Sequence, residues 1–339
     1  MRINQNLSTI NDPIFLSSTF IQDFPSQWGY SRVDNPTRLA LEGELAEIEK
    51  AKFALAFSSG SSAISCLLTM LKRGDHILCH HEVYEGTHRL LNQIFNKFGV
   101  NSDFINLNNR KEIKKSIKPN TKLILFENIT NPNLEKINIE KIHQIIKKNK
   151  ILVAVDNTIC TPIFENPLSL GADIVVHSLT KFIGGHHDLL GGAIMINDIN
   201  LFRNLRFIQQ SIGLVLDPFS CSLVSRSLKT LDLRMKKHTA NAIKVFSTLK
   251  VHKLVHKINF PGISGIISFQ LNNEINWKVF LKRLKFIKIA QSFGGTETTI
   301  LHPVSMMNLS ISVDKNFFRL SVGLEKSEQI IRDIIGALK

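Results

Sequence analysis

The sequence has few cysteines and no pattern that would pair them. Cys66, Cys79, Cys160 and Cys221 are widely spaced, and no Cys-x-x-Cys occurs among them. This spacing does not suggest a disulfide framework or a structural zinc site, so we expect four reduced and mostly buried thiols. Cys160 follows Asp156 closely. It is the cysteine that we expect nearest to a functional site.

Long apolar runs are also missing. No stretch approaches the roughly 20 apolar residues that a membrane-spanning helix needs. Residues 1–11 are polar and lack the apolar segment of a secretory signal. We therefore expect a soluble, cytoplasmic protein with no membrane partner.

Motifs for nucleotides and metals are absent as well. The chain contains neither Gly-x-x-x-x-Gly-Lys-Ser/Thr nor Gly-x-Gly-x-x-Gly. Its paired histidines, His80-His81 and His186-His187, are adjacent, so their side chains diverge on most backbones. They do not have the His-Glu-x-x-His spacing that places two ligands on one helix face. The sequence predicts no metal site.

Acidic residues are outnumbered by basic ones, 28 against 42, which gives a net charge of +14. Clustered Lys and Arg would suggest a nucleic-acid partner. Here the lysines are spread through segments such as 111–118 and 141–150, among isoleucines and asparagines. No nucleic-acid motif accompanies them, so we expect solvated faces and no nucleic-acid partner. A basic protein that binds through its surface remains the alternative.

Two polar residues that follow apolar strands carry the main functional signal. Asp156 directly follows the apolar run 151–155, and Lys181 comes five residues after the apolar pair 175–176. In an open α/β sheet the carboxyl ends of the strands form the ligand crevice. A lysine and an aspartate at such ends suit pyridoxal phosphate (PLP), because the amine can form a Schiff base and the carboxylate can hold the ring nitrogen protonated. Taken alone, Lys181 would be interpreted as a solvated loop lysine.

Neighbouring residues strengthen the functional interpretation. Ser178 and Thr180 flank the lysine, and the glycines at 184–185 leave room for a flat ligand. Upstream, residues 54–64 predict a short strand, a Ser/Gly turn and a helix start, where Gly60 and Ser61 can offer N–H groups to a phosphate. An ordinary serine-rich helix cap explains this stretch equally well.

The alternation of strand and helix patterns predicts an α/β protein with a mostly parallel sheet covered on both faces. We expect an N-terminal arm at 1–40, a cofactor-binding α/β domain at 41–226, and a smaller C-terminal α+β domain at 227–339. Long helical periodicity covers 228–249. Tyr30 and Tyr84 are the only tyrosines. Tyr84 follows a predicted strand, where its ring could lie against a planar cofactor.

Several separate stretches together resemble one known family, the PLP-dependent enzymes of cysteine and methionine metabolism, which include cystathionine γ-synthase, γ-lyase and β-lyase and methionine γ-lyase. They occur in the family's order and run nearly from end to end of the chain. The matching stretches are residues 17–20, 30–32, 35–38, 58–60, 83–84 with 86–87, 156–158, 170–173, 177–181 (His-Ser-Leu-Thr-Lys), 292–295 and 319–323. The resemblance implies an aspartate aminotransferase-like, type I PLP-dependent transferase fold.

The resemblance also implies roles for individual residues. Lys181 matches the Schiff-base lysine, Asp156 the partner of the ring nitrogen, and Tyr84 the stacking tyrosine that assists proton transfer. Three further groups are implied: phosphate contacts within one subunit, Gly60, Ser61, Ser178 and Thr180; phosphate contacts from the neighbouring subunit, Tyr30 and Arg32; and residues at or near the substrate carboxylate, Arg319, Ser292, Asn131 and Arg89.

These matches imply a trans-sulfuration enzyme that catalyses γ- or β-elimination or replacement on cystathionine or an O-acylhomoserine, as a homodimer or homotetramer with shared active sites. We expect a cystathionine γ-lyase or γ-synthase type, with cystathionine β-lyase or methionine γ-lyase as the alternative. Four positions depart from the family pattern: Gly29, Ser61, Glu85 and Ile129. Two loops are shortened, so a degenerate, non-catalytic PLP-fold protein is the alternative of another class.

Overall fold

The computed structural model describes residues 10–22, 28–306 and 313–339. Within these residues, a seven-stranded sheet has the strand order β1-β7-β6-β5-β4-β2-β3. Its neighbouring strands are parallel except where β7 pairs with β1 and β6. The strands are β1 (Phe53–Phe57), β2 (His76–His80), β3 (Asn101–Ile105), β4 (Thr121–Glu127), β5 (Leu152–Asp156), β6 (Ile174–Ser178) and β7 (Gly192–Ile196).

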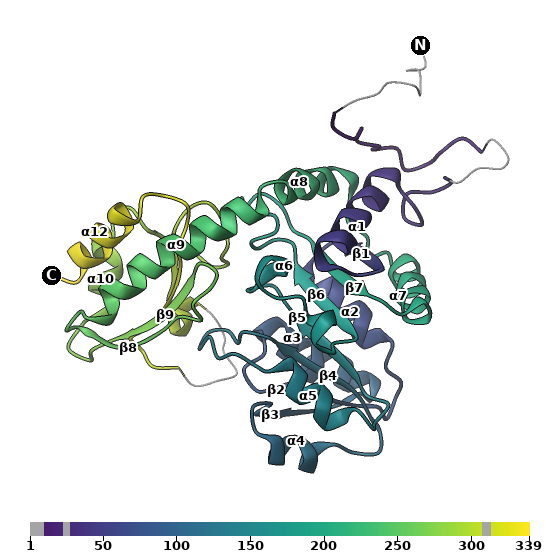
Figure 1. Ribbon diagram of the computed structural model, residues 1–339, viewed down its shortest axis with the longest axis horizontal. Coiled ribbons are helices and arrows are strands. Elements are labelled where there is room, and N and C mark those ends of the chain that lie inside the picture. The colour runs from purple at the N-terminus through teal and green to yellow at the C-terminus, as the bar shows by residue number, and fades with distance from the viewer. Residues whose placement is uncertain (1–9, 23–27, 307–312) are drawn as a thin grey trace.

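Helices pack on both faces of this sheet (Figure 1). In β1, Leu55 and Phe57 pack into one core cluster while Ala54 and Ala56 pack into another, as the period of two in a strand requires. The helices are α1 (Pro36–Glu49), α2 (Gly60–Thr69), α3 (Glu85–Arg89), α4 (Arg110–Ser116), α5 (Ile139–Ile146), α6 (Thr161–Phe164), α7 (Ile199–Ile212) and α8 (Pro218–Leu228). Shorter helical turns are Leu90–Ile94, Phe95–Phe98 and Pro167–Leu170.

The long helix α9 (Leu231–Lys250) leads along the chain to a second sheet and packs against it (Figure 1). The strand order of this sheet is β10-β11-β12-β9-β8. Its core includes the rings of Phe269, Phe280 and Phe318, which contact one another. Its strands are β8 (Val255–Asn259), β9 (Ile266–Leu271), β10 (Lys288–Ile289), β11 (Thr299–Leu301) and β12 (Phe317–Ser321). Its remaining helices are α10 (Trp277–Arg283), α11 (Pro303–Met306) and α12 (Ser327–Ala337).

The described part of the N-terminal segment runs outward from the body beside α1 (Figure 1). Asn35 caps α1 by accepting hydrogen bonds from the backbone N–H groups of Thr37 and Arg38. The predicted divisions at residues 40 and 226 remain predictions; α1 begins at Pro36, and α8 spans residue 226. Among the described residues, no helix is both long enough and apolar enough to cross a bilayer.

Candidate active site

The carboxyl ends of three neighbouring strands bring polar residues to one edge of the larger sheet. Glu127 ends β4 and is paired in register with Asp156, which ends β5. Ser178 ends β6, and Lys181 follows it by one turn. All four line one cavity of about 760 Å³ that extends to the second sheet. Parallel strands direct their carboxyl ends to the same edge, so these residues converge although they are distant in sequence.

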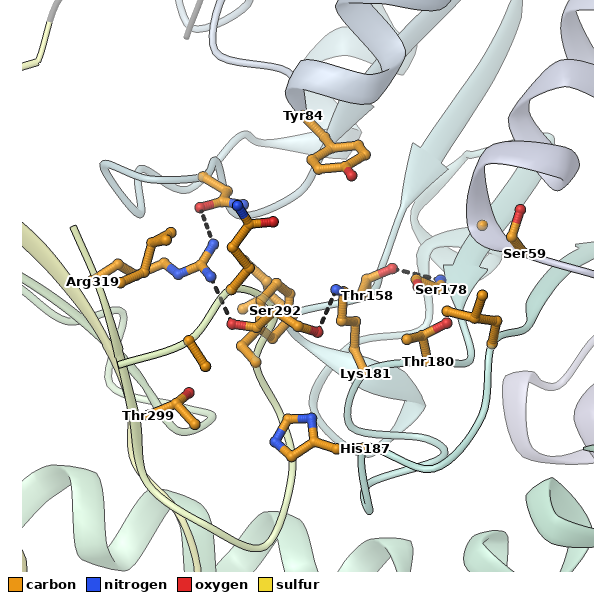
Figure 2. Close-up of a pocket in the computed structure, with 18 of the residues that line it drawn as sticks. Ser59, Tyr84, Thr158, Ser178, Thr180, Lys181, His187, Ser292, Thr299 and Arg319 are labelled. Carbon is orange, nitrogen blue, oxygen red and sulfur yellow. Dashed lines mark hydrogen bonds between the residues drawn. The ribbon is translucent and has the colours of Figure 1, made fainter. Parts of the chain in front are cut away.

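Lys181 connects the two sheets at this cavity. Its Nζ donates a hydrogen bond of 2.7 Å to Oγ of Ser292, which follows β10 (Figure 2). Burial, assisted by the guanidinium of Arg319, lowers the pKa of Lys181 to about 8, although Asp156 opposes the shift. A larger fraction of this amine is therefore neutral near pH 7 than for a solvated lysine, as a nucleophile or proton acceptor requires.

Asp156 is held by its own strand end. Oδ1 accepts hydrogen bonds from the N–H and the hydroxyl of Thr158, at 3.0 and 2.5 Å. The Thr158 hydroxyl also accepts from the N–H of Ser178, so β5 and β6 are joined at this point (Figure 2). Burial raises the pKa of Asp156, while the bonds from Thr158 oppose that shift. No ion pair to Asp156 occurs within the described residues, so the carboxylate fits a protonated ring nitrogen.

The first turn of the ten-residue helix α2 forms a candidate anion site. Its N-cap Ser59, together with Gly60 and Ser61, lines the cavity opposite Ser178 and Thr180. A β-carbon at position 60 would lie 3.1 Å from the side chain of Ser178, so glycine permits this close approach. Backbone N–H groups at a helix start, joined by hydroxyl donors, are the groups that bind phosphate. The donor set fits the phosphate of PLP.

Tyr84 carries the ring that is expected to cover a flat cofactor. Its side chain remains 39% exposed and extends into the cavity (Figure 2). Its backbone N–H donates to the Glu127 carboxylate. Gly86 leaves space for the ring, because a β-carbon there would collide with it. Burial raises the pKa of Glu127, and neighbouring Asp156 raises it further.

Arg319 lies on β12, with 4% of its side chain exposed. Nη1 donates to Oδ1 of Asn131 at 2.9 Å, and Nη2 donates to the carbonyl oxygen of Ser292 at 2.8 Å (Figure 2). Its buried Nε has no hydrogen-bond partner among the described residues. A buried guanidinium with a donor left over fits a ligand carboxylate.

The cavity brings together most of the residues that the sequence singled out. Those that line it are Gly60, Ser61, Tyr84, Asn131, Asp156, Ser178, Thr180, Lys181, Ser292 and Arg319. Arg89 ends α3 and does not line it. Tyr30 and Arg32 lie outside it too; Arg32 stacks over the Tyr30 ring and donates to the carbonyl of Gln210 on α7. Cys160 is fully buried in the core and does not line the cavity, although its neighbour Ile159 does.

Sequence reasoning missed five ionisable residues that line the cavity: Glu127, His186, His187, Lys288 and Glu297. Glu127 had a usable signal, since it ends an apolar strand as Asp156 does. Lys288 and Glu297 had none, because Lys288 is on the short strand β10 and Glu297 in the connection from β10 to β11, and sequence does not specify how this part of the second sheet is arranged.

From the lowered pKa of Lys181 we predict how the rate of PLP attachment depends on pH. Only the neutral amine reacts with an aldehyde, so the rate of covalent PLP attachment should rise with pH and level off above a pKa of about 8. Arg319→Gln removes a nearby positive charge, so its profile should shift to higher pH. Stopped-flow absorbance across pH 6–10 would measure both profiles. Coincident profiles, or a wild-type midpoint at the ordinary lysine value of about 10.4, would contradict the prediction.

Comparisons with known proteins identify the family of this chain. The family model described as Cys/Met metabolism PLP-dependent enzyme matches residues 1–339. A cystathionine beta-lyase of Lactococcus lactis subsp. cremoris (strain MG1363) is 38% identical, over 99% of this chain and 96% of that protein. A cystathionine gamma-lyase of Bacillus subtilis (strain 168) has the same identity and coverage.

Solved structures are similar as well. The metB structure from Corynebacterium glutamicum has a TM-score of 0.95 at 36% identity and covers 99% of this chain and 94% of that one. The cystathionine gamma-lyase of Lactobacillus plantarum, in complex with L-serine, has a TM-score of 0.93 at 34% identity, with coverages of 96% and 92%. The predicted fold class and family are confirmed. The chain belongs to the Cys/Met metabolism PLP-dependent enzyme family.

Proposed function

We propose that this protein binds PLP and cleaves or replaces the bond between Cγ or Cβ of an amino acid and its leaving group, with cystathionine or an O-acylhomoserine as substrate. One observation carries the proposal. Ser292 accepts from the amine of Lys181 through its hydroxyl and from the guanidinium of Arg319 through its carbonyl. A proton-accepting amine and a carboxylate-binding group are thereby held beside the same residue.

Different residues of the cavity would bind different parts of the cofactor. Gly60, Ser61, Ser178 and Thr180 would hold the phosphate, and Asp156 would hold the ring nitrogen. PLP, when bound, supplies a ring that accepts electrons from the substrate Cα. Tyr84 would cover one face of that ring and keep water from it.

The same residues position the substrate for the reaction. Arg319 would bind the α-carboxylate, because its fork matches carboxylate geometry. Lys181 Nζ would take the proton from Cα, and Ser292 would keep the amine directed toward it by its hydrogen bond. A leaving group at Cβ can then depart with its bonding electron pair; one at Cγ would depart only after a Cβ proton is also lost, and in both cases the departing group takes up a proton.

The proposal also has to specify whether the bond at Cβ or the bond at Cγ is cleaved. The relatives differ in name: beta-lyase, gamma-lyase and, at 36% identity, a Bacillus subtilis cystathionine gamma-synthase/O-acetylhomoserine (thiol)-lyase. We infer γ-elimination as the main reaction. Gln291, which lines the cavity, is polar at a position where the family resemblance places an apolar residue in several synthases, and this favours a lyase.

Incubation with L-cystathionine tests this proposal. Cysteine and 2-oxobutyrate are the products of the expected γ-elimination, whereas homocysteine and pyruvate would show β-elimination. O-succinyl- and O-acetylhomoserine, each with cysteine, test replacement in parallel. If PLP is bound and none of these substrates gives product, the protein is the degenerate, non-catalytic member of the fold.

Shared active sites belong to the same proposal. Tyr30 and Arg32 lie outside the cavity of their own chain and are exposed, which supports a role in the neighbouring subunit. A cytoplasmic homodimer or homotetramer is expected, and four buried free thiols are consistent with that compartment.

Complementation between two inactive variants measures this sharing. Arg32→Ala and Lys181→Ala chains should each have little activity, and an equal mixture that has exchanged subunits should recover about a quarter of the wild-type activity. Half of its dimers would be hybrids with one intact site out of two. Size-exclusion chromatography with light scattering controls for assembly. A mixture that exchanges subunits and stays inactive would show that sites are not shared.

A further inference from the structure

One face of the second sheet connects Arg319 with a second cation. Arg319 on β12 is paired with Leu301 on β11. Thr299 lies two residues before Leu301 and is paired with Lys288 on β10. Paired residues, and residues two apart in a strand, share a face of the sheet. All four line the cavity, so this face forms a continuous wall from Arg319 to Lys288.

The spacing of the two cations suits a substrate with charged groups at both ends. Two strand spacings and a shift of two residues place the Cα atoms of Arg319 and Lys288 about 12 Å apart. An extended chain of eight atoms, the length of cystathionine from one carboxyl carbon to the other, is about 9 Å long. A hydrogen bond of about 3 Å at each end extends its reach to about 15 Å. Such a molecule can touch both cations.

Lys288 is available for a ligand in the part of the chain that the structure describes. Its side chain is exposed and forms no hydrogen bond or ion pair with a described residue. Arg319, by contrast, is buried and already holds Asn131 and Ser292. The cavity therefore has a rigid, preorganised cation at one end and an adaptable, solvated one at the other.

Glu297 adds the opposite charge at the solvated end. It lies between β10 and β11 and lines the same cavity. The Thr296 hydroxyl donates to its carboxylate at 2.9 Å. This bond lowers the pKa of Glu297, with smaller contributions from the charges of Lys288 and His187. The carboxylate thus stays ionised at neutral pH beside the Lys288 ammonium.

We propose that Lys288 and Glu297 recognise the distal end of the substrate, Lys288 through a distal carboxylate and Glu297 through a distal ammonium group. The preferred substrates are then amino acids whose leaving portion ends in a carboxylate or in a second amino-acid group. This inference rests on the proposed function, because the proposed function assigns Arg319 to the α-carboxylate of the substrate.

Three probes of equal length test the inference without turnover. L-2-aminooctanoate, L-2-aminosuberate and L,L-2,7-diaminosuberate each have eight carbons and no leaving group, and their distal ends are respectively neutral, anionic and zwitterionic. Titration calorimetry with the PLP-loaded protein would give their dissociation constants. Each added distal charge should tighten binding roughly fivefold, the upper range for an exposed ion pair.

Two variants assign the effect to the two residues. Lys288→Gln should remove the gain from the distal carboxylate, so that aminosuberate binds no better than aminooctanoate. Glu297→Gln should remove only the further gain of diaminosuberate. Lys285→Gln and Glu274→Gln make the same charge changes at exposed positions that do not line the cavity, and they should leave all three constants unchanged.

Equal binding of the three probes by the wild-type protein would overturn the inference. So would Lys288→Gln and Glu297→Gln variants that weaken all three probes to the same extent, because that result shows a general effect on the cavity. A wild-type protein that distinguishes the probes as expected, yet gives no product from cystathionine or from either O-acylhomoserine with cysteine, would instead refute the proposed function and leave the distal site standing.

Discussion

Lys181→Ala protein is expected to fold, to bind PLP without a covalent bond, and to lose turnover by at least about 10³-fold, within the range for removal of a positioned proton-transfer group. The side chain donates to Ser292, and the charge of Arg319 acts on it, so its removal takes away the amine that the proposal assigns to the Cα proton. Rates of 2-oxo acid release, with the absorbance of the bound cofactor, would measure the loss.

Lys136→Ala is the matched control, because this exposed lysine pairs with Glu165 and does not line the cavity. It should keep wild-type turnover. Circular dichroism and thermal unfolding of both variants would show that the fold is retained. A Lys181→Ala protein that keeps more than a tenth of the wild-type rate would contradict the role assigned to this amine.

Asp156→Asn should keep the cofactor and lose about 10²- to 10³-fold in turnover, the range for removing one preorganised electrostatic group. The amide can still accept from the Thr158 N–H and hydroxyl, so the geometry is conserved. What is lost is the negative charge that holds the ring nitrogen protonated and the ring able to accept electrons. Steady-state rates, with PLP content measured after release, separate turnover from binding.

Asp173→Asn provides the comparison for that variant. Asp173 is another strand-associated carboxylate, and it accepts from the backbone of Val153 away from the cavity. Its substitution should affect stability more than turnover. If Asp156→Asn and Asp173→Asn had equal rates, Asp156 would have a structural role, and the assignment of the ring-nitrogen partner would be wrong.

The parts of the site that sequence predicted are those encoded by local patterns. Asp156 and Lys181 follow apolar strands, and Gly60 and Ser61 begin a helix directly after a strand. The local sequence is therefore enough to show where each of these strands ends. The carboxyl ends of parallel strands meet at one edge of a sheet, and these local signals were therefore sufficient to predict a common site.

The remaining residues depend on contacts between distant segments. Asn131, Ser292 and Arg319 were assigned through family resemblance. Arg319 joins them by two hydrogen bonds, and the one to Asn131 links the second sheet to the segment that follows β4. Lys288 reaches the cavity through the β10–β11–β12 pairing, whose register the short strands do not reveal, and Glu297 lies in the connection between β10 and β11. Sequence alone could not have found them.

The central claim is that Lys181 is the amine that holds PLP. Reduction of the purified, PLP-loaded protein with borohydride, followed by proteolysis and mass spectrometry, tests it most directly. We expect one pyridoxyl group per chain, on the peptide that contains Lys181, and none in the Lys181→Ala protein. A pyridoxyl group on Lys288 or any other lysine, or no modified peptide at all, would contradict the account.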